Sequence, residues 1–132
     1  MMNAQAALLR GRVAAEALMV DSCTVQRPTG TVTDHVTGEV FPYFVPVYSG
    51  LCKLQQTISQ AANPTSGGHS FTVLESRFDT PVGSGPFLVG DMVTIVTAPL
   101  DPQLVGRVFR IVEPFNKSFA TAQRVRVEEV VA

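Results

Sequence analysis

The hydrophobic positions at the start of the chain repeat with the period of an α-helix. Those that recur at spacings of three or four residues are Leu9, Val13, Ala17 and Val20. The residues around them are mostly strong helix formers and include no proline, although Gly11 lowers helix stability by roughly 1 kcal/mol relative to alanine. The pattern predicts one amphipathic helix over residues 3–20, within an N-terminal segment 1–20. We expect its apolar face to contact another subunit as well as its own domain.

From residue 21 onward, the pattern changes to short runs of β-branched and aromatic residues separated by Gly, Pro and Asp. The runs expected to form strands span residues 22–27, 40–48, 51–55, 71–78, 91–97, 107–113 and 123–131. The last run alternates most cleanly, because Val125 and Val127 share one face and charged residues occupy the other. The pattern predicts a mainly β fold, a small β-barrel or sandwich of about seven short strands over residues 21–132 with one N-terminal helix.

Proline and glycine mark the expected turns in the first half of the β region. Residues 28–30, Pro-Thr-Gly, indicate a break after the first strand, and Gly38 can supply the positive φ of a hairpin bend. Pro42 and Pro46 cannot donate hydrogen bonds to a ladder. We therefore expect the strand at 40–48 to lie at an edge or to carry a bulge.

One long stretch, residues 54–74, contains no Asp, Glu, Lys or Arg. Its middle, residues 56–70, is polar and is too long for an ordinary hairpin loop. Such loops are usually either functional or disordered, so this segment is either a functional loop or a simple surface loop. The residues on which a functional role depends are Gln56, Thr57, Ile58, Ser59, Gln60, Asn63, Pro64, Gly67, Gly68 and His69.

Composition and charge exclude several classes of protein. A chain of 132 residues suits one domain, 1–132, and a hydrophobic content of 45% argues against disorder. The net charge of −1 gives no basic excess for wrapping nucleic acid. The sequence has no apolar run long enough for a transmembrane helix and no signal-peptide pattern, so we expect no membrane partner and assembly in the cytoplasm. The charged content, 16% against a usual value of about 25%, indicates that other subunits cover part of the surface.

Residues with catalytic or metal-binding chemistry are sparse. His35 and His69 fall in predicted loops, and neither has a metal-like spacing to another ligand. Cys23 and Cys52 lie in apolar, strand-like runs, which indicates reduced core thiols, and whether they are neighbours depends on the strand order. The sequence contains no nucleophile–base set and no phosphate-binding loop. We expect no enzymatic activity, no cofactor and no metal.

The order of the elements carries a resemblance to a known family. Its segments are the strand and turn at 24–30, the hairpin at 34–39, Val-Tyr-Ser-Gly at 47–50, Leu-Cys-Lys-Leu-Gln at 51–55, Val-Gly-Asp-Met-Val at 89–93 and Gly-Arg-Val-Phe-Arg-Ile-Val at 106–112. This order resembles the head–tail joining proteins of tailed bacteriophages, the head-completion or head-to-tail stopper group. The segments 10–16 and 21–25 look like the version found in phages of actinobacteria.

The resemblance implies a virion protein of the neck, a β-barrel subunit of a homo-oligomeric ring that is commonly sixfold. Such a ring lies below the portal and adaptor proteins, extends the DNA channel and offers the docking surface for the tail terminator or tail tube. Double-stranded DNA passes through the lumen without sequence readout. The loop after the third strand, here residues 56–70, projects into the channel in that family and helps to retain packaged DNA.

Two alternatives stay open. The first is a tail terminator, or another ring of the same neck and tail assembly. The second is a small β-barrel binding module for a ligand or single-stranded nucleic acid, which would present exposed aromatic side chains on a sheet. The aromatic residues that could serve this purpose are Phe41, Tyr43, Phe44 and Tyr48.

Overall fold

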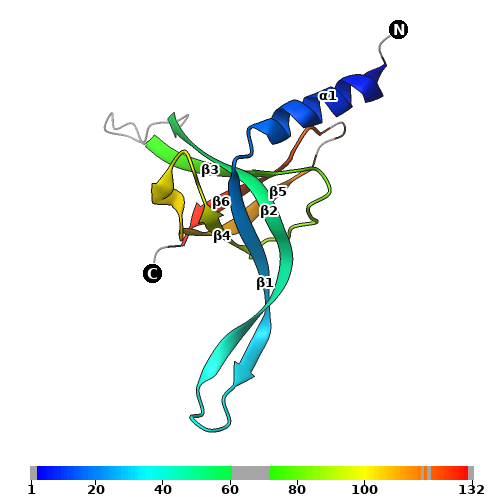
Figure 1. The fold of residues 1–132 in the computed structure, drawn as a ribbon. Coiled ribbons are helices and arrows are strands. Elements are labelled where there is room, and N and C mark those ends of the chain that lie inside the picture. Colours follow the sequence, from blue (N-terminus) through cyan, green and yellow to red (C-terminus); the bar gives the residue numbers. More distant parts are fainter. Residues whose placement is uncertain (1–2, 61–71, 117, 119, 131–132) are drawn as a thin grey trace, which may run out of the picture.

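The computed structural model describes residues 3–60, 72–116, 118 and 120–130, and its core is a closed antiparallel β-barrel (Figure 1). The elements are α1 (Ala4–Ala17), β1 (Asp21–Thr33), β2 (Val40–Gln60), β3 (Thr72–Thr80), β4 (Met92–Thr97), the short 3₁₀ helix η1 (Pro102–Leu104), β5 (Val108–Phe115) and β6 (Gln123–Glu129). Around the barrel the strand order is β1-β2-β3-β6-β5-β4. The predicted mainly β fold with one N-terminal helix is confirmed, and the barrel form is the correct one of the two.

The described residues form six strands, whereas seven were predicted, because residues 40–55 belong to one strand. Ser49 and Gly50 were expected to interrupt it, but they pair with Thr24 and Cys23 of β1. The Tyr48 hydroxyl donates a hydrogen bond of 2.7 Å to the carbonyl oxygen of Leu51 and so spans the glycine. A Cβ at Gly50 would lie 2.8 Å from that hydroxyl oxygen, so the close packing of Tyr48 requires the glycine.

The strand β1 also continues through a predicted break. The register with β2 shifts between Pro28 and Thr31, and Gly30 has a φ of 131°, so the Pro-Thr-Gly sequence forms a bulge and not a turn. A second shift separates the pairs Val25–Tyr48 and Gln26–Pro46. The predicted bulge in the proline-containing strand is thereby confirmed.

The barrel interior is filled by alternate residues of the strands, as the two-residue period of a β-strand requires. Its buried cluster is Cys23, Val25, Cys52, Phe78, Phe87, Val93, Ile95, Ala98, Phe109, Ile111, Val125 and Val127. Cys23 and Cys52 are free thiols that lie on adjacent strands and interact in this core. The hydrogen bond with Cys23, together with burial, raises the pKa of Cys52. The expectation of reduced core thiols is confirmed.

The helix α1 is shorter than predicted and leaves the barrel at an angle (Figure 1). The Asn3 side chain caps it by accepting a hydrogen bond of 2.8 Å from the amide of Ala6. Val20 lies beyond its end, so the expected extent to residue 20 is wrong. The helix contacts the β5–β6 connection, where Arg12 Nε donates a hydrogen bond of 3.1 Å to the carbonyl oxygen of Ala120.

The predicted polar loop at 56–70 begins with strand residues. Residues 56–60 extend β2 and pair in register with residues 76–72 of β3. The assignment of Gln56, Thr57, Ile58, Ser59 and Gln60 to a loop is therefore wrong, because backbone pairing with β3 makes them a strand without an apolar alternation. The remaining positions, Asn63, Pro64, Gly67, Gly68 and His69, lie outside the described residues.

Candidate interaction surface

The first two strands extend well beyond the barrel as a two-stranded ribbon, residues 27–46, which we call the arm (Figure 1). Within the barrel, β1 pairs with β4 over residues 22–26, and β2 pairs with β3 from Lys53 onward. Between those limits the two strands pair only with each other in the described part of the chain. Beyond its base, the arm therefore makes no strand pairing with the barrel that carries it in the part of the chain described.

The arm ends in the tight turn that the sequence predicts at residues 34–39. The amide of Asp34 donates a hydrogen bond of 2.8 Å to the carbonyl oxygen of Glu39, and Gly38 has a φ of 76°. The Asp34 carboxylate accepts a hydrogen bond of 2.8 Å from the amide of Val36. This bond lowers the pKa of Asp34, so the carboxylate is charged and holds the turn closed. His35 lies exposed in the same turn.

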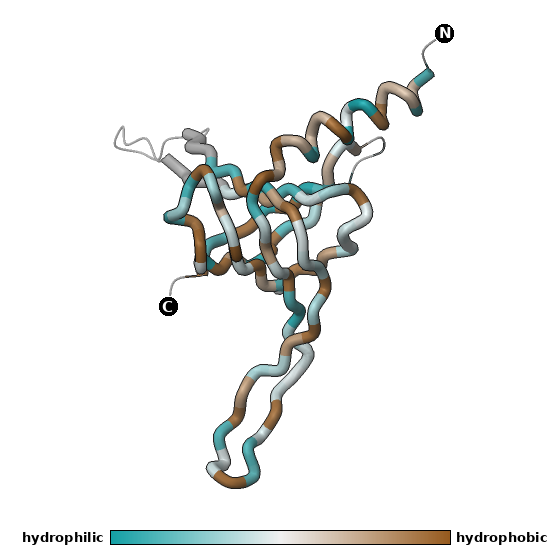
Figure 2. Tube along the Cα trace, viewed as in Figure 1, coloured by the Kyte–Doolittle hydropathy of each residue, from teal (hydrophilic) through white to brown (hydrophobic). Residues whose placement is uncertain are grey.

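One face of the arm is apolar and exposed. Phe41, Tyr43 and Val45 follow one another at two-residue spacing, and Val32 pairs with Phe41 across the ribbon. Their exposed fractions are 48%, 54%, 40% and 50%, respectively. Figure 2 shows hydrophobic positions continuing along the arm away from the barrel. We call these four residues the arm face.

The edges of the arm are unsuited to further strand pairing. Pro28, Pro42 and Pro46 each lack an amide donor, and the two register shifts distort the ladder. An isolated two-stranded ribbon is at best marginally stable in water. The prolines and the register shifts therefore leave the arm edges with few regular positions for pairing a further strand.

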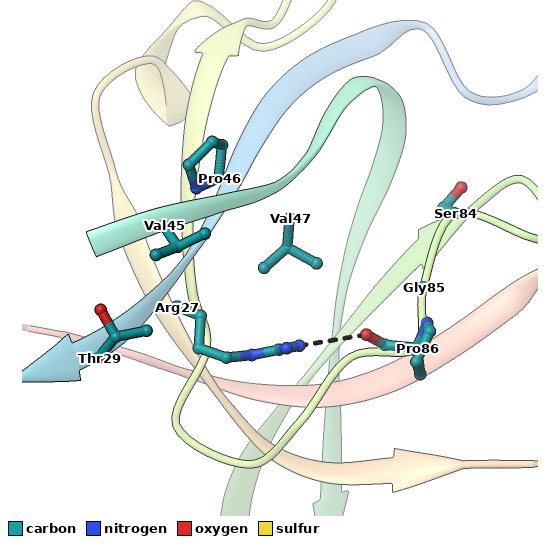
Figure 3. A pocket seen from close by; sticks show the side chains of 8 residues that line it. All are labelled: Arg27, Thr29, Val45, Pro46, Val47, Ser84, Gly85 and Pro86. Atoms are coloured by element: carbon teal, nitrogen blue, oxygen red, sulfur yellow. Dashed lines mark hydrogen bonds between the residues drawn. The ribbon is translucent and has the colours of Figure 1, made fainter.

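An ion pair fixes the base of the arm to the barrel. Arg27 donates to the Asp91 carboxylate through Nε at 2.9 Å and through Nη2 at 3.0 Å. The buried carboxylate of Asp91 also accepts a hydrogen bond of 2.8 Å from the amide of Leu88. Arg27 Nη2 reaches the carbonyl oxygen of Pro86 at 3.2 Å (Figure 3). The hydrogen bond with Asp91 raises the pKa of Arg27, so Arg27 is charged and the ion pair is bidentate.

A groove lies where the arm meets the barrel, between β2 and the segment before β4 (Figure 3). Its lining is Arg27, Thr29, Val45, Pro46, Val47, Ser84, Gly85 and Pro86. The only titratable side chain among these is that of Arg27, which is held by Asp91. The groove continues the arm face at Val45, and its lining mixes apolar side chains with the polar groups of Arg27, Thr29 and Ser84.

The predicted apolar face of the helix points away from its own barrel. Leu9, Val13 and Val20 are 53%, 68% and 41% exposed, and Ala17 is exposed as well. We call Leu9, Val13 and Ala17 the helix face. The contact with the barrel is made instead by Gly11 and Arg12, and a Cβ at Gly11 would lie 2.8 Å from Thr121 Cγ2. The expectation that the same stripe also covers its own domain is therefore wrong.

The aromatic cluster noted in the sequence is divided between different environments. Phe41 and Tyr43 lie on the arm face, whereas Phe44 is half-buried on the opposite face of the ribbon. Tyr48 packs against the barrel core, with its ring 6.2 Å from that of Phe87. Burial raises the pKa of Tyr48, and its hydroxyl stays protonated as a donor. The four rings do not form one stacking platform for single-stranded nucleic acid.

Sequence reasoning missed the ion pair and two members of the arm face. Arg27 and Asp91 are 64 positions apart, and no local pattern links them. Val32 follows the bulge at residues 28–31, and Val45 precedes Pro46. These interruptions hid the two-residue alternation that would have placed both valines on one face of a strand. Within the described ranges, no group of three or more His, Cys, Asp or Glu side chains could hold a metal ion. Among the helices described, none is long and apolar enough to cross a membrane.

Comparison with protein families finds a match over most of the chain. Residues 11–128 match a family of unknown function, DUF6093. The matched span runs from the glycine at the helix–barrel contact almost to the end of β6, and it includes the whole arm. Comparison with the curated proteins gives no match.

Proposed function

The chain belongs to the family of unknown function DUF6093, and we propose that it is a structural, ring-forming subunit of the head-to-tail connector of a tailed bacteriophage. In this role it is a virion protein that extends the portal channel, helps to retain packaged DNA and offers the docking surface for the tail. It carries out no catalysis. The order of sequence elements that resembles the head-to-tail stopper proteins is the starting point of the proposal.

The observation that carries the proposal is the arm. It projects from a closed barrel (Figure 1), its base is fixed by a bidentate ion pair, and its apolar face is uncovered. A monomeric protein gains nothing from holding four large apolar side chains away from its core, because exposed apolar surface favours association. A subunit of an assembly needs such a surface, and a ring needs two different ones. The helix face supplies the second.

The barrel itself supports the same role. Closure removes the open sheet edges that would otherwise pair with other chains without control. The subunit can therefore associate only through the parts that project from the barrel and through its outer face. Retention of packaged DNA is the part of the proposal that the resemblance assigns to residues 56–70, of which the structure describes residues 56–60.

The test is the mass of the full-length protein, measured by native mass spectrometry alone and after mixing with purified portal complexes. We expect a ring in at least one of the two conditions, seen as a free mass or as a mass added to the portal that is a whole multiple of 14.2 kDa. A protein that stays monomeric in both conditions contradicts the proposal. Mixing with tail tubes in place of portals distinguishes the tail-terminator alternative, which requires binding to tubes and none to portals.

A further inference from the structure

We propose that, in the ring, the arm face of each subunit packs along the helix face of the neighbouring copy. This inference rests on the proposed ring-forming function and specifies its interface. The occupant of the arm face is then a second copy of this chain. The contact repeats once per subunit. It forms a closed ring when the rotation between neighbouring subunits is a whole fraction of a full turn.

The two faces have matching lengths and spacings. From Phe41 to Val45 the arm face runs about 13 Å, at about 3.3 Å per residue. From Leu9 to Ala17 the helix face runs about 12 Å, at 1.5 Å per residue. Two residues along the arm thus correspond to four along the helix. The resulting pairs are Phe41 with Leu9, Tyr43 with Val13, and Val45 with Ala17.

The charges of the two elements fix the direction of this alignment. Between residues 28 and 47 the charged side chains are the carboxylates of Asp34 and Glu39, with no Lys or Arg. The helix has no acidic residue in its first turn, and its one acidic residue, Glu16, lies near its C-terminal end. An acidic arm tip beside the N-terminal half of α1 meets the positive end of the helix dipole. The opposite direction would place the tip beside Glu16.

The pairing also buries the exposed arm face and the exposed helix face in the same contact. Each subunit has one arm face and one helix face, so a heterologous contact covers every copy of each in a closed ring. A symmetric arm-to-arm contact would leave the helix faces in water. It would also join surfaces that carry charge of the same sign. The arm and α1 lie at opposite ends of the barrel, so a subunit cannot fold its own arm onto its own helix (Figure 1).

The test is disulfide cross-linking of double-cysteine variants under mild oxidation in the assembled ring. The native thiols are buried and do not compete. The in-register variants are Phe41→Cys with Leu9→Cys, Tyr43→Cys with Val13→Cys, and Val45→Cys with Ala17→Cys. The matched controls are the out-of-register variant Phe41→Cys with Ala17→Cys, and Val40→Cys with Val13→Cys, which uses the opposite face of the arm. All substituted positions are exposed, and circular dichroism checks that each variant folds.

We expect the three in-register variants to give a ladder of covalent multimers on a non-reducing gel, at least tenfold more product than either control. Equal product from the controls overturns the inference. Covalent dimers from Tyr43→Cys alone show arm-to-arm contact and overturn it too, while the proposed function stands because a ring has formed. Absence of any ring, with or without portal complexes, is the separate failure of the proposed function.

Discussion

Truncation of the two aromatic side chains on the arm face should separate assembly from folding. The change is the double substitution of Phe41→Ser and Tyr43→Ser. These side chains are 48% and 54% exposed, and a whole Phe or Tyr side chain contributes about 150–250 Å² of surface. The two together therefore leave about 200 Å² for a partner to bury, which is worth about 5 kcal/mol per interface at 25 cal/mol per Å².

The cost to the folded barrel should be much smaller, because both side chains lie on the arm and neither belongs to the buried cluster of the barrel. Within the arm, the loss includes the cross-strand contact between Phe41 and Val32, worth about 0.2–1 kcal/mol. The matched control is Val40→Ser, which removes an apolar side chain that is 59% exposed on the opposite face of the arm. We expect the control to change neither folding nor assembly by more than about 0.5 kcal/mol.

Urea unfolding measures the first quantity, and sedimentation velocity over a concentration series measures the second. We expect the double variant to unfold near the wild-type urea midpoint while its association constant falls by about a thousandfold or more. An association constant within threefold of wild type would refute the assignment of the arm face as an interface. Equal loss of association in Val40→Ser would refute the assignment of one specific face.

Three further predictions concern the folded subunit itself. Asp91→Asn should lower the free energy of unfolding by about 2–3 kcal/mol, because Arg27 would lose the buried carboxylate to which it donates two hydrogen bonds. Urea unfolding measures this loss. Gly50→Ala should lower the melting temperature, since the new Cβ would lie 2.8 Å from the Tyr48 hydroxyl; the same change in a Tyr48→Phe background should cost less, and an equal cost would contradict this packing. Asp21→Asn should raise the melting temperature at pH 7, because desolvation and then Asp101 raise the pKa of Asp21 above its ordinary 3.8, so its contribution to stability is lost as the pH rises through that raised value. The gain should disappear below pH 3.8, where Asp21 is protonated in both states, and a gain that persists there would point to another cause.

Local signals in the sequence predicted those elements whose pattern is decided within a few residues. The alternation around Val125 and Val127 predicted β6, and Gly38 predicted the arm turn with its positive φ. The same local reasoning failed where a partner strand decides the outcome. Residues 56–60 lack apolar alternation, yet pairing with β3 makes them strand, and Gly50 stays within β2 because β1 pairs with it.

The candidate surface was predictable only in part. Leu9, Val13 and Ala17 were recognised as an apolar stripe, but periodicity cannot tell which side of a helix meets the barrel. That side is decided by Gly11, whose lack of a side chain permits close approach to Thr121. The turn and the second strand of the arm were predicted, but its first strand was not, because Pro28 and the segment after it read as the end of a strand when the opposing register is unknown.

The continuity of β1 and β2 from barrel to arm has a mechanical consequence. A force applied at the arm tip travels along both strands and pulls against the β1–β4 and β2–β3 ladders parallel to their length. The hydrogen bonds of each ladder then resist together in shear, and no single bond can open before the others as in a zipper. Resistance to such pulling is governed by the rate of unfolding and not by equilibrium stability. The arm can therefore transmit tension to the barrel that anchors it while the barrel keeps its shape.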